Sequence, residues 1–158
     1  MKFICDTMLG KLAKYLRIVG VDASYSNSLA ISQIMSKASA EQRTILTRRT
    51  DHMPLVQTEA SYFIQSDYPL EQLQDVIRHF NLQADSSSFF TRCLECNQLL
   101  DSVDKNSVAG SVPPYVFNTV DTFARCPHCY KIYWKGTHYG NMLKRLQKVL
   151  GVVKEETC

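Results

Sequence analysis

The sequence predicts a parallel α/β domain, followed by a small cysteine-containing module and a C-terminal helix. Three observations predict this fold. Short apolar runs alternate with helical patterns in the first half, two CxxC pairs follow, and the last regular pattern is again helical. Alternating strands and helices favour a parallel sheet with helices on its faces. We divide the chain into an α/β domain (1–84), a linker (85–90), a cysteine module (91–137) and a helix with its tail (138–158).

The elements follow from the spacing of apolar residues. Short apolar runs predict strands, and apolar residues repeated every three or four positions predict helices. The predicted strands are residues 3–5, 23–26, 44–47 and 62–64. The predicted helices are residues 9–19, 29–37, 70–80 and 139–150. Gly20 is well placed to end the first helix.

Composition is that of a globular protein. Of the 158 residues, 45% are apolar and 21% are charged, which argues against general disorder. No apolar run is long enough to span a membrane. Asp6 and Lys11 interrupt the N-terminal apolar run, which makes it a poor secretory signal. We therefore expect a cytoplasmic protein whose cysteines are reduced or bound to metal.

Two cysteine pairs predict a structural zinc site. The ligands would be Cys93, Cys96, Cys126 and Cys129, because two CxxC turns complete a tetrahedral shell of four thiolates. Residues 97–125 between the pairs exceed the usual ribbon spacing, so an enlarged hairpin is expected. The alternative is thiol redox chemistry, which normally uses one CxxC pair at the start of a helix.

Positive charge is concentrated in the C-terminal part. The net charge is +3, and no Asp or Glu lies between Asp121 and Glu155. Basic residues interleaved with aromatic rings suit an RNA strand, because cations bind phosphates and rings stack on bases. The alternative is a solvated basic face. The candidate RNA contacts are Lys131, Trp134, Lys135 and His138.

Three acids follow predicted strands. Asp6 comes after the first strand, Asp51 after the third and Asp67 after the fourth. The carboxyl ends of parallel strands share one edge of the sheet, where they can hold Mg²⁺ or Mn²⁺. The alternative is that these acids only cap helices or stabilise turns.

Several motifs of the chain match those of a known family. The first motif reads DTMLGKLAKYLRIVGVD at residues 6–22. The other motifs are residues 45–48, 66–67 with 71–73, 90–93, 112–116 and 133–138. With these motifs the chain resembles the Mut-seven C-terminal RNase family over about residues 2–150. This resemblance implies a PIN-like nuclease fold with a C-terminal zinc ribbon. It also implies divalent-metal-dependent cleavage of RNA.

The family pattern is not complete in this chain. Asp6 matches its first acid, and Asp67 matches the acid after its fourth strand. The family reads Leu-Thr-Arg-Asp after the third strand, whereas this chain has Arg49 in place of the Asp. Asp51 is the nearest substitute for that carboxylate.

These patterns lead to a ribonuclease as the first hypothesis, with Asp6, Asp51 and Asp67 as its catalytic acids. Further candidate RNA contacts are Lys11, Lys14 and Arg17, whose spacing places them on one exposed stripe of the first helix, with Thr47 and Arg48 at the sheet edge. The second hypothesis is an RNA-binding module of the same fold without catalysis. A third is a protein-interaction adaptor that uses the ribbon.

Overall fold

The computed structural model describes residues 1–52, 60–83 and 85–151. Within them the chain forms two compact units, residues 1–97 and residues 98–158. None of the described helices has the length and apolar character needed to cross a membrane.

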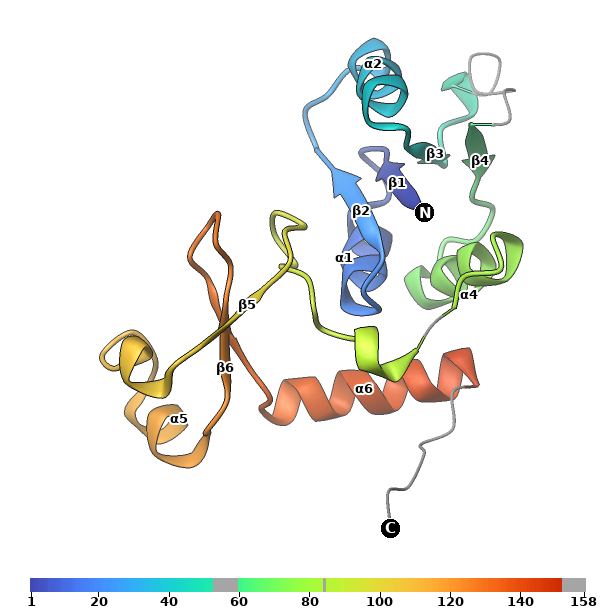
Figure 1. Ribbon diagram of the computed structural model, residues 1–158. Helices are drawn as coiled ribbons and strands as arrows, with labels where there is room; N and C mark the ends of the chain where they lie inside the picture. Colours follow the sequence, from blue (N-terminus) through green and yellow to red (C-terminus); the bar gives the residue numbers. More distant parts are fainter. Residues whose placement is uncertain (53–59, 84, 152–158) are drawn as a thin grey trace. The chain divides into compact units, whose positions relative to one another are not determined.

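The first unit is built on a four-stranded parallel sheet (Figure 1). Its strands are β1 (Lys2–Cys5), β2 (Asp22–Tyr25), β3 (Thr44–Thr47) and β4 (Ser61–Phe63). The strand order is β2-β1-β3-β4, and every neighbouring pair is parallel. The central strand β1 is apolar and almost fully buried, as expected for a strand covered on both faces. The predicted parallel sheet is confirmed.

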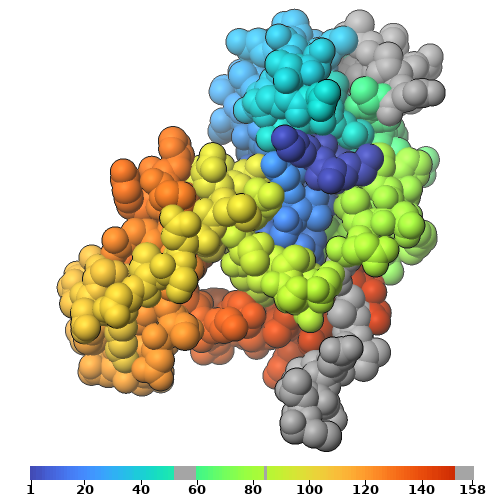
Figure 2. Space-filling view, viewed as in Figure 1, coloured from blue at the N-terminus to red at the C-terminus, as the bar shows by residue number. Residues whose placement is uncertain are grey.

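Helices cover both faces of this sheet. They are α1 (Gly10–Ile18), α2 (Ile31–Glu41) and α4 (Pro69–His79), with a short 3₁₀ turn at Thr50–His52. Ile4 packs with Ile34 of α2 on one face. Phe3 points to the opposite face, where its ring lies 5.0 Å from that of Phe80, just after α4. Figures 1 and 2 show α2 and α4 on either side of the N-terminal residues.

The last part of the first unit, residues 85–97, packs against the end of α1. They include a 3₁₀ turn at Ser86–Ser88, and the Phe90 amide donates to the Ile18 carbonyl at 2.6 Å. Arg92 Nε donates to the Gly20 carbonyl at 2.9 Å. The sequence analysis begins the cysteine module at residue 91, before the first CxxC pair. The compact units instead divide after this pair, at residues 97 and 98, because these hydrogen bonds tie the pair to the end of α1.

The second unit contains a three-stranded antiparallel sheet of order β5-β6-β7. Its strands are β5 (Asp101–Val103), β6 (Phe123–Arg125) and β7 (Ile132–Trp134). Its core is formed by Val108, Val112 and Phe123. The enlarged hairpin between the cysteine pairs contains a 3₁₀ turn (Lys105–Val108) and α5 (Pro114–Thr119). Helix α6 (Thr137–Leu150) then ends at Gly151, while the tail after it lies outside the described residues.

Candidate metal and nucleic-acid sites

Asp6 lies directly after β1, and its carboxylate is fully buried. Oδ1 accepts a hydrogen bond from the Met8 amide at 2.8 Å. Oδ2 accepts from the Arg48 amide at 2.9 Å and from the Thr47 hydroxyl at the end of β3. Burial of a carboxylate is costly unless donors replace its water, and three donors do so here. The Asp6 side chain is therefore fixed at the carboxyl edge of the sheet.

Asp67 and Asp51 each pair with an arginine that follows β3. Arg48 Nη1 donates to Asp67, whose side chain is 80% exposed. Arg49 forms a bidentate pair with Asp51, with Nε–Oδ1 at 3.1 Å and Nη2–Oδ2 at 2.6 Å. These hydrogen bonds and the Asp51 charge raise the pKa of Arg49, and the Asp6 charge adds to that shift. Residues 47–49 thus contact all three predicted acids.

Each acid is nevertheless occupied by its own donors. Among the described residues, the four cysteines are the one group of three or more His, Cys, Asp or Glu side chains placed closely enough to share a metal ion. Asp6, Asp51 and Asp67 share one edge of the sheet but do not form such a group.

Two predicted RNA contacts, Arg17 and Thr47, are buried inside the first unit, and their prediction is therefore wrong. Arg17 is only 3% exposed, so the prediction that it shares an open face with Lys11 and Lys14 is wrong. The two lysines are exposed, and Lys14 Nζ lies 3.5 Å from Glu95 Oε1. Thr47 is fully buried with its hydroxyl bound to Asp6, and therefore it is not available to phosphate.

The first cysteine turn is bonded to the α/β unit through Arg17. Its Nη1 donates to the carbonyls of Leu94 at 2.6 Å and Glu95 at 3.0 Å. Its Nε donates to the Ala23 carbonyl on β2 at 2.8 Å. Asn97, just after the turn, accepts from the Ala23 amide at 3.1 Å. Arg17 therefore orients a cysteine turn.

The four predicted cysteines form a cluster. The Sγ atoms of Cys93, Cys96, Cys126 and Cys129 all lie within 4.8 Å of one another. Tetrahedral ligands with zinc–sulfur bonds of about 2.3 Å lie about 3.8 Å apart, which is within this limit, so the donor set fits a metal ion such as Zn²⁺. None of the five described cysteines is in a disulfide. His128 is exposed and is not part of the cluster.

The predicted RNA contacts of the second unit lie on its surface. Lys131, Lys135 and His138 are exposed, and Trp134 is 37% exposed. Lys135 Nζ lies 5.7 Å from the centre of the Tyr139 ring, close enough for a cation–π contact.

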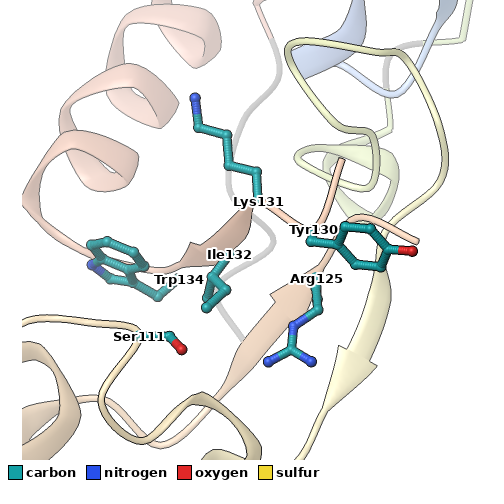
Figure 3. A pocket seen from close by; sticks show the side chains of 6 residues that line it. All are labelled: Ser111, Arg125, Tyr130, Lys131, Ile132 and Trp134. Atoms are coloured by element: carbon teal, nitrogen blue, oxygen red, sulfur yellow. The ribbon is translucent and has the colours of Figure 1, made fainter. Parts of the chain in front are cut away.

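A pocket of about 420 Å³ lies beside Trp134 and Lys131. It is lined by Ser111, Arg125, Tyr130, Lys131, Ile132 and Trp134 (Figure 3). Ser111, Arg125 and Tyr130 are not among the predicted site residues. Strand alternation could have identified Arg125 from the sequence. Arg125 lies opposite Ile132 in the antiparallel sheet, so the two side chains share one face.

The sequence matches the Mut7-C RNAse domain family over residues 1–146, nearly the whole chain. This chain belongs to that family. It is also 34% identical over 101 residues to the human protein "Exonuclease mut-7 homolog". That match covers 61% of this chain but only 12% of the human protein. No solved structure matches the chain.

The structure shows where the side chain of Arg49 points. In this Mut7-C domain, the guanidinium of Arg49 is turned onto Asp51, two residues along the chain. The sequence resemblance predicts an acid at position 49, so the carboxylate predicted to substitute for it is held by the residue at that position.

Proposed function

We propose that this Mut7-C domain hydrolyses phosphodiester bonds of RNA with a divalent metal ion, Mg²⁺ or Mn²⁺, bound at its acidic edge. The observation that carries the proposal is the network in which residues 47–49 contact Asp6, Asp51 and Asp67. Family membership favours RNA as the substrate.

The carboxylates suit a hard divalent ion in their chemistry. A carboxylate has about four acceptor positions, and Asp6 uses three for the donors described above. Asp51 and Asp67 are held through exposed ion pairs, which generally contribute little stability and can be exchanged. Asp6, Asp51 and Asp67 would hold the ion, which when bound supplies an activated water and neutralises phosphate charge.

Arg48 and Arg49 could bind an RNA phosphate at this edge of the sheet and thereby leave their carboxylate partners. A guanidinium binds phosphate as readily as carboxylate, because both anions match its planar donors. Within the described ranges, Arg48 Nε is the buried side-chain nitrogen or oxygen without a hydrogen-bond partner. A phosphate that draws these guanidiniums away would also release Asp51 and Asp67.

The cysteine cluster serves a different role in this proposal. Four thiolates fill a tetrahedral shell, so a bound Zn²⁺ would stabilise the fold and not take part in hydrolysis. Lys131, Trp134, Lys135 and His138 would add RNA contacts from the second unit.

Cleavage of a generic single-stranded RNA in the presence of Mn²⁺ tests the proposal. We expect cleavage by the wild type and its loss in both Asp6→Asn and Asp67→Asn. The second variant changes an exposed side chain, so misfolding does not explain its loss. Asp101→Asn, an exposed acid on β5, is the matched control and should cleave normally. Equal cleavage by all four proteins would refute the proposed site.

A second function is favoured by the arginine–carboxylate pairs themselves. If Arg48 and Arg49 remain on Asp67 and Asp51, both carboxylates stay paired with arginines, and the domain binds RNA without cutting it. RNA affinity that falls with added salt, together with no Mn²⁺-dependent cleavage, would identify this case. Absence of any RNA affinity would leave the adaptor hypothesis.

A further inference from the structure

The pocket of the second unit is built on one face of its antiparallel sheet. Arg125 lies opposite Ile132, and Phe123 lies opposite Trp134, so these four side chains share a face. Phe123 is buried in the core at one end of this face. Arg125, Ile132 and Trp134 continue the face into the open pocket, as Figure 3 shows.

Tyr130 lines the same pocket from an unusual backbone position. Its φ is +60°, and its amide donates to the Cys126 carbonyl at 3.0 Å. Asn97 occupies the equivalent position of the first cysteine turn, with φ +68° and a 3.0 Å bond to the Cys93 carbonyl. Asn is favoured in this left-handed region, whereas a bulky aromatic residue is a rare outlier there.

Packing does not explain the choice of tyrosine. The Tyr130 side chain is 72% exposed, so its ring contributes little to the core. Residues kept in unfavourable backbone regions tend to lie at ligand-binding sites. A strained, exposed aromatic ring at a pocket therefore points to a ligand that contacts it.

The backbone at Gly136 passes close to the edge of the Trp134 indole. A Cβ added at Gly136 would lie 3.1 Å from Nε1 and 3.3 Å from Cδ1 of Trp134. The Gly136 amide also donates to the Trp134 carbonyl at 3.1 Å. Glycine thus lets the backbone pass close to the indole edge, while one part of the ring stays exposed.

Two cations complete the pocket. Arg125 Nη2 donates to the Ser107 carbonyl at 2.8 Å, which fixes the orientation of the guanidinium. Lys131 is exposed and also lines the pocket, with its ammonium directed away from the Arg125 guanidinium (Figure 3). The volume of about 420 Å³ falls within the usual range of small-molecule sites. Aromatic faces and cations in one pocket are the combination that binds a nucleotide.

We propose that this pocket binds one unpaired nucleotide of an RNA strand, with its base stacked on Trp134 and its phosphate bound by Arg125. Tyr130 would contact the same nucleotide from the cysteine turn. The proposal rests on the RNA binding proposed above, and it adds that the RNA must be single-stranded at this point. A paired base has both faces covered by its neighbours in the helix and cannot enter.

The single tryptophan of the chain makes the pocket directly observable. Intrinsic fluorescence of the zinc-loaded full chain would be titrated with a short single-stranded RNA, with the same strand annealed to its complement, and with an otherwise identical strand carrying abasic sites. We expect quenching by the single strand. The duplex and the abasic strand should quench at least tenfold more weakly at equal concentration.

Variants separate stacking from general charge. Trp134→Ala should weaken binding of the single strand about tenfold, measured by anisotropy of labelled RNA, and leave binding of the abasic strand unchanged. Trp134→Phe should recover part of the loss. Gly136→Ala keeps the indole but displaces it, and it should reduce the quenching. Tyr115→Ala removes a 77% exposed ring of α5 outside the pocket and should have no effect.

The outcomes distinguish this inference from the function on which it rests. RNA binding without quenching, or equal binding of single strand and duplex, would overturn the pocket assignment while RNA binding itself stands. Absence of binding to every RNA would overturn both. Equal losses for Trp134→Ala and Tyr115→Ala would also refute a specific site at Trp134.

Discussion

Asp6, Asp51 and Asp67 differ in the kind of donor that holds them. Asp6 is bound by two backbone amides and a buried hydroxyl, which cannot move without changing the sheet edge. Asp51 and Asp67 are bound by arginine side chains, which can rotate away. The ability of this edge to hold a metal ion therefore depends on where Arg48 and Arg49 point.

Replacing Arg49 tests this dependence. Arg49→Asp removes a positive charge near the proposed metal site and introduces the carboxylate that the sequence resemblance predicts there, so Mn²⁺ should bind at least tenfold more tightly. Calorimetric titration with Mn²⁺ measures this, and adding Asp6→Asn should abolish the gain. Arg78→Asp makes the same charge change at the far end of α4 and should not alter affinity. Unchanged Mn²⁺ affinity in Arg49→Asp would show that Arg49 does not oppose the metal.

Asp22 predicts a pH dependence on the opposite edge of the sheet. Burial alone would raise its pKa, but hydrogen bonds from Arg43 and Asn97 and the charge of Arg43 lower it below the ordinary value of 3.8. A lowered pKa means that the Asp22 carboxylate stabilises the fold above about pH 4. This stabilisation is lost as the pH falls through the lowered value.

Asp22→Asn should therefore cost about 2 kcal/mol of unfolding free energy at pH 7, because it removes one charge of a partly buried pair. The difference from wild type should shrink as the pH falls from about 4 through the lowered pKa of Asp22, because protonation removes the same charge as the substitution. Urea denaturation between pH 3 and pH 7 checks both statements. Asp101→Asn, an exposed acid, should leave the curve unchanged. A constant difference over this range would exclude Asp22 as the source.

At the scale of elements, the end of α1 brings distant segments together. Gly20 has φ +86°, and a Cβ there would lie 2.5 Å from the Ser88 carbonyl oxygen. The Ser88 hydroxyl also donates to the Val19 carbonyl at 3.1 Å. Gly20 thus provides both a left-handed turn and the space in which residues 85–90 pack against the helix.

Gly20→Ala should lower the free energy of unfolding by more than the penalty of placing alanine at a positive φ. Gly110 has a similar φ of +75° with nothing within 4 Å, so Gly110→Ala measures the backbone penalty by itself, about 1 kcal/mol. Gly20→Ala adds a contact with a backbone atom and should cost at least about 2 kcal/mol. Thermal denaturation of the two variants gives the comparison. Equal losses would mean that residue 88 moves aside freely.

At the scale of the whole molecule, the cysteine cluster joins turns that are far apart in the sequence. The small antiparallel sheet has a short core of three buried residues. Such a core rarely supports folding without a metal or a disulfide. Zinc bound by four thiolates typically contributes roughly 10–16 kcal/mol in small domains.

Cys126→Ser should therefore lower the zinc content and expose β6 and β7. Atomic absorption measures the zinc, and amide hydrogen exchange should become fast in these strands while β1 and β3 stay protected. His128→Ala changes an exposed residue inside the same turn and should retain one zinc ion per chain. Zinc-free wild-type protein, or slow exchange in the Cys126→Ser strands, would argue against a structural zinc site.

Local pattern was sufficient for much of the fold. The β3 strand has its predicted bounds, and the parallel sheet follows from the alternation of strands and helices. The four clustered cysteines are those of the two CxxC pairs. These features were predictable because apolar periodicity and ligand spacing are encoded within a few neighbouring residues.

Partner choice among charged side chains was decided by the tertiary structure alone. Helical spacing places Arg17 in a stripe with Lys11 and Lys14, yet Arg17 is buried on carbonyls of residues 94 and 95. The sequence around residue 17 does not predict these two carbonyl acceptors, which lie more than 70 residues further along the chain. The pairing of Arg48 with Asp67 likewise depends on a residue brought close by folding. The position of the exposed Tyr130 ring depends on the backbone geometry of its turn. Sequence spacing defines which face of an element a side chain takes, whereas its partner depends on which segment the folded chain places opposite that face.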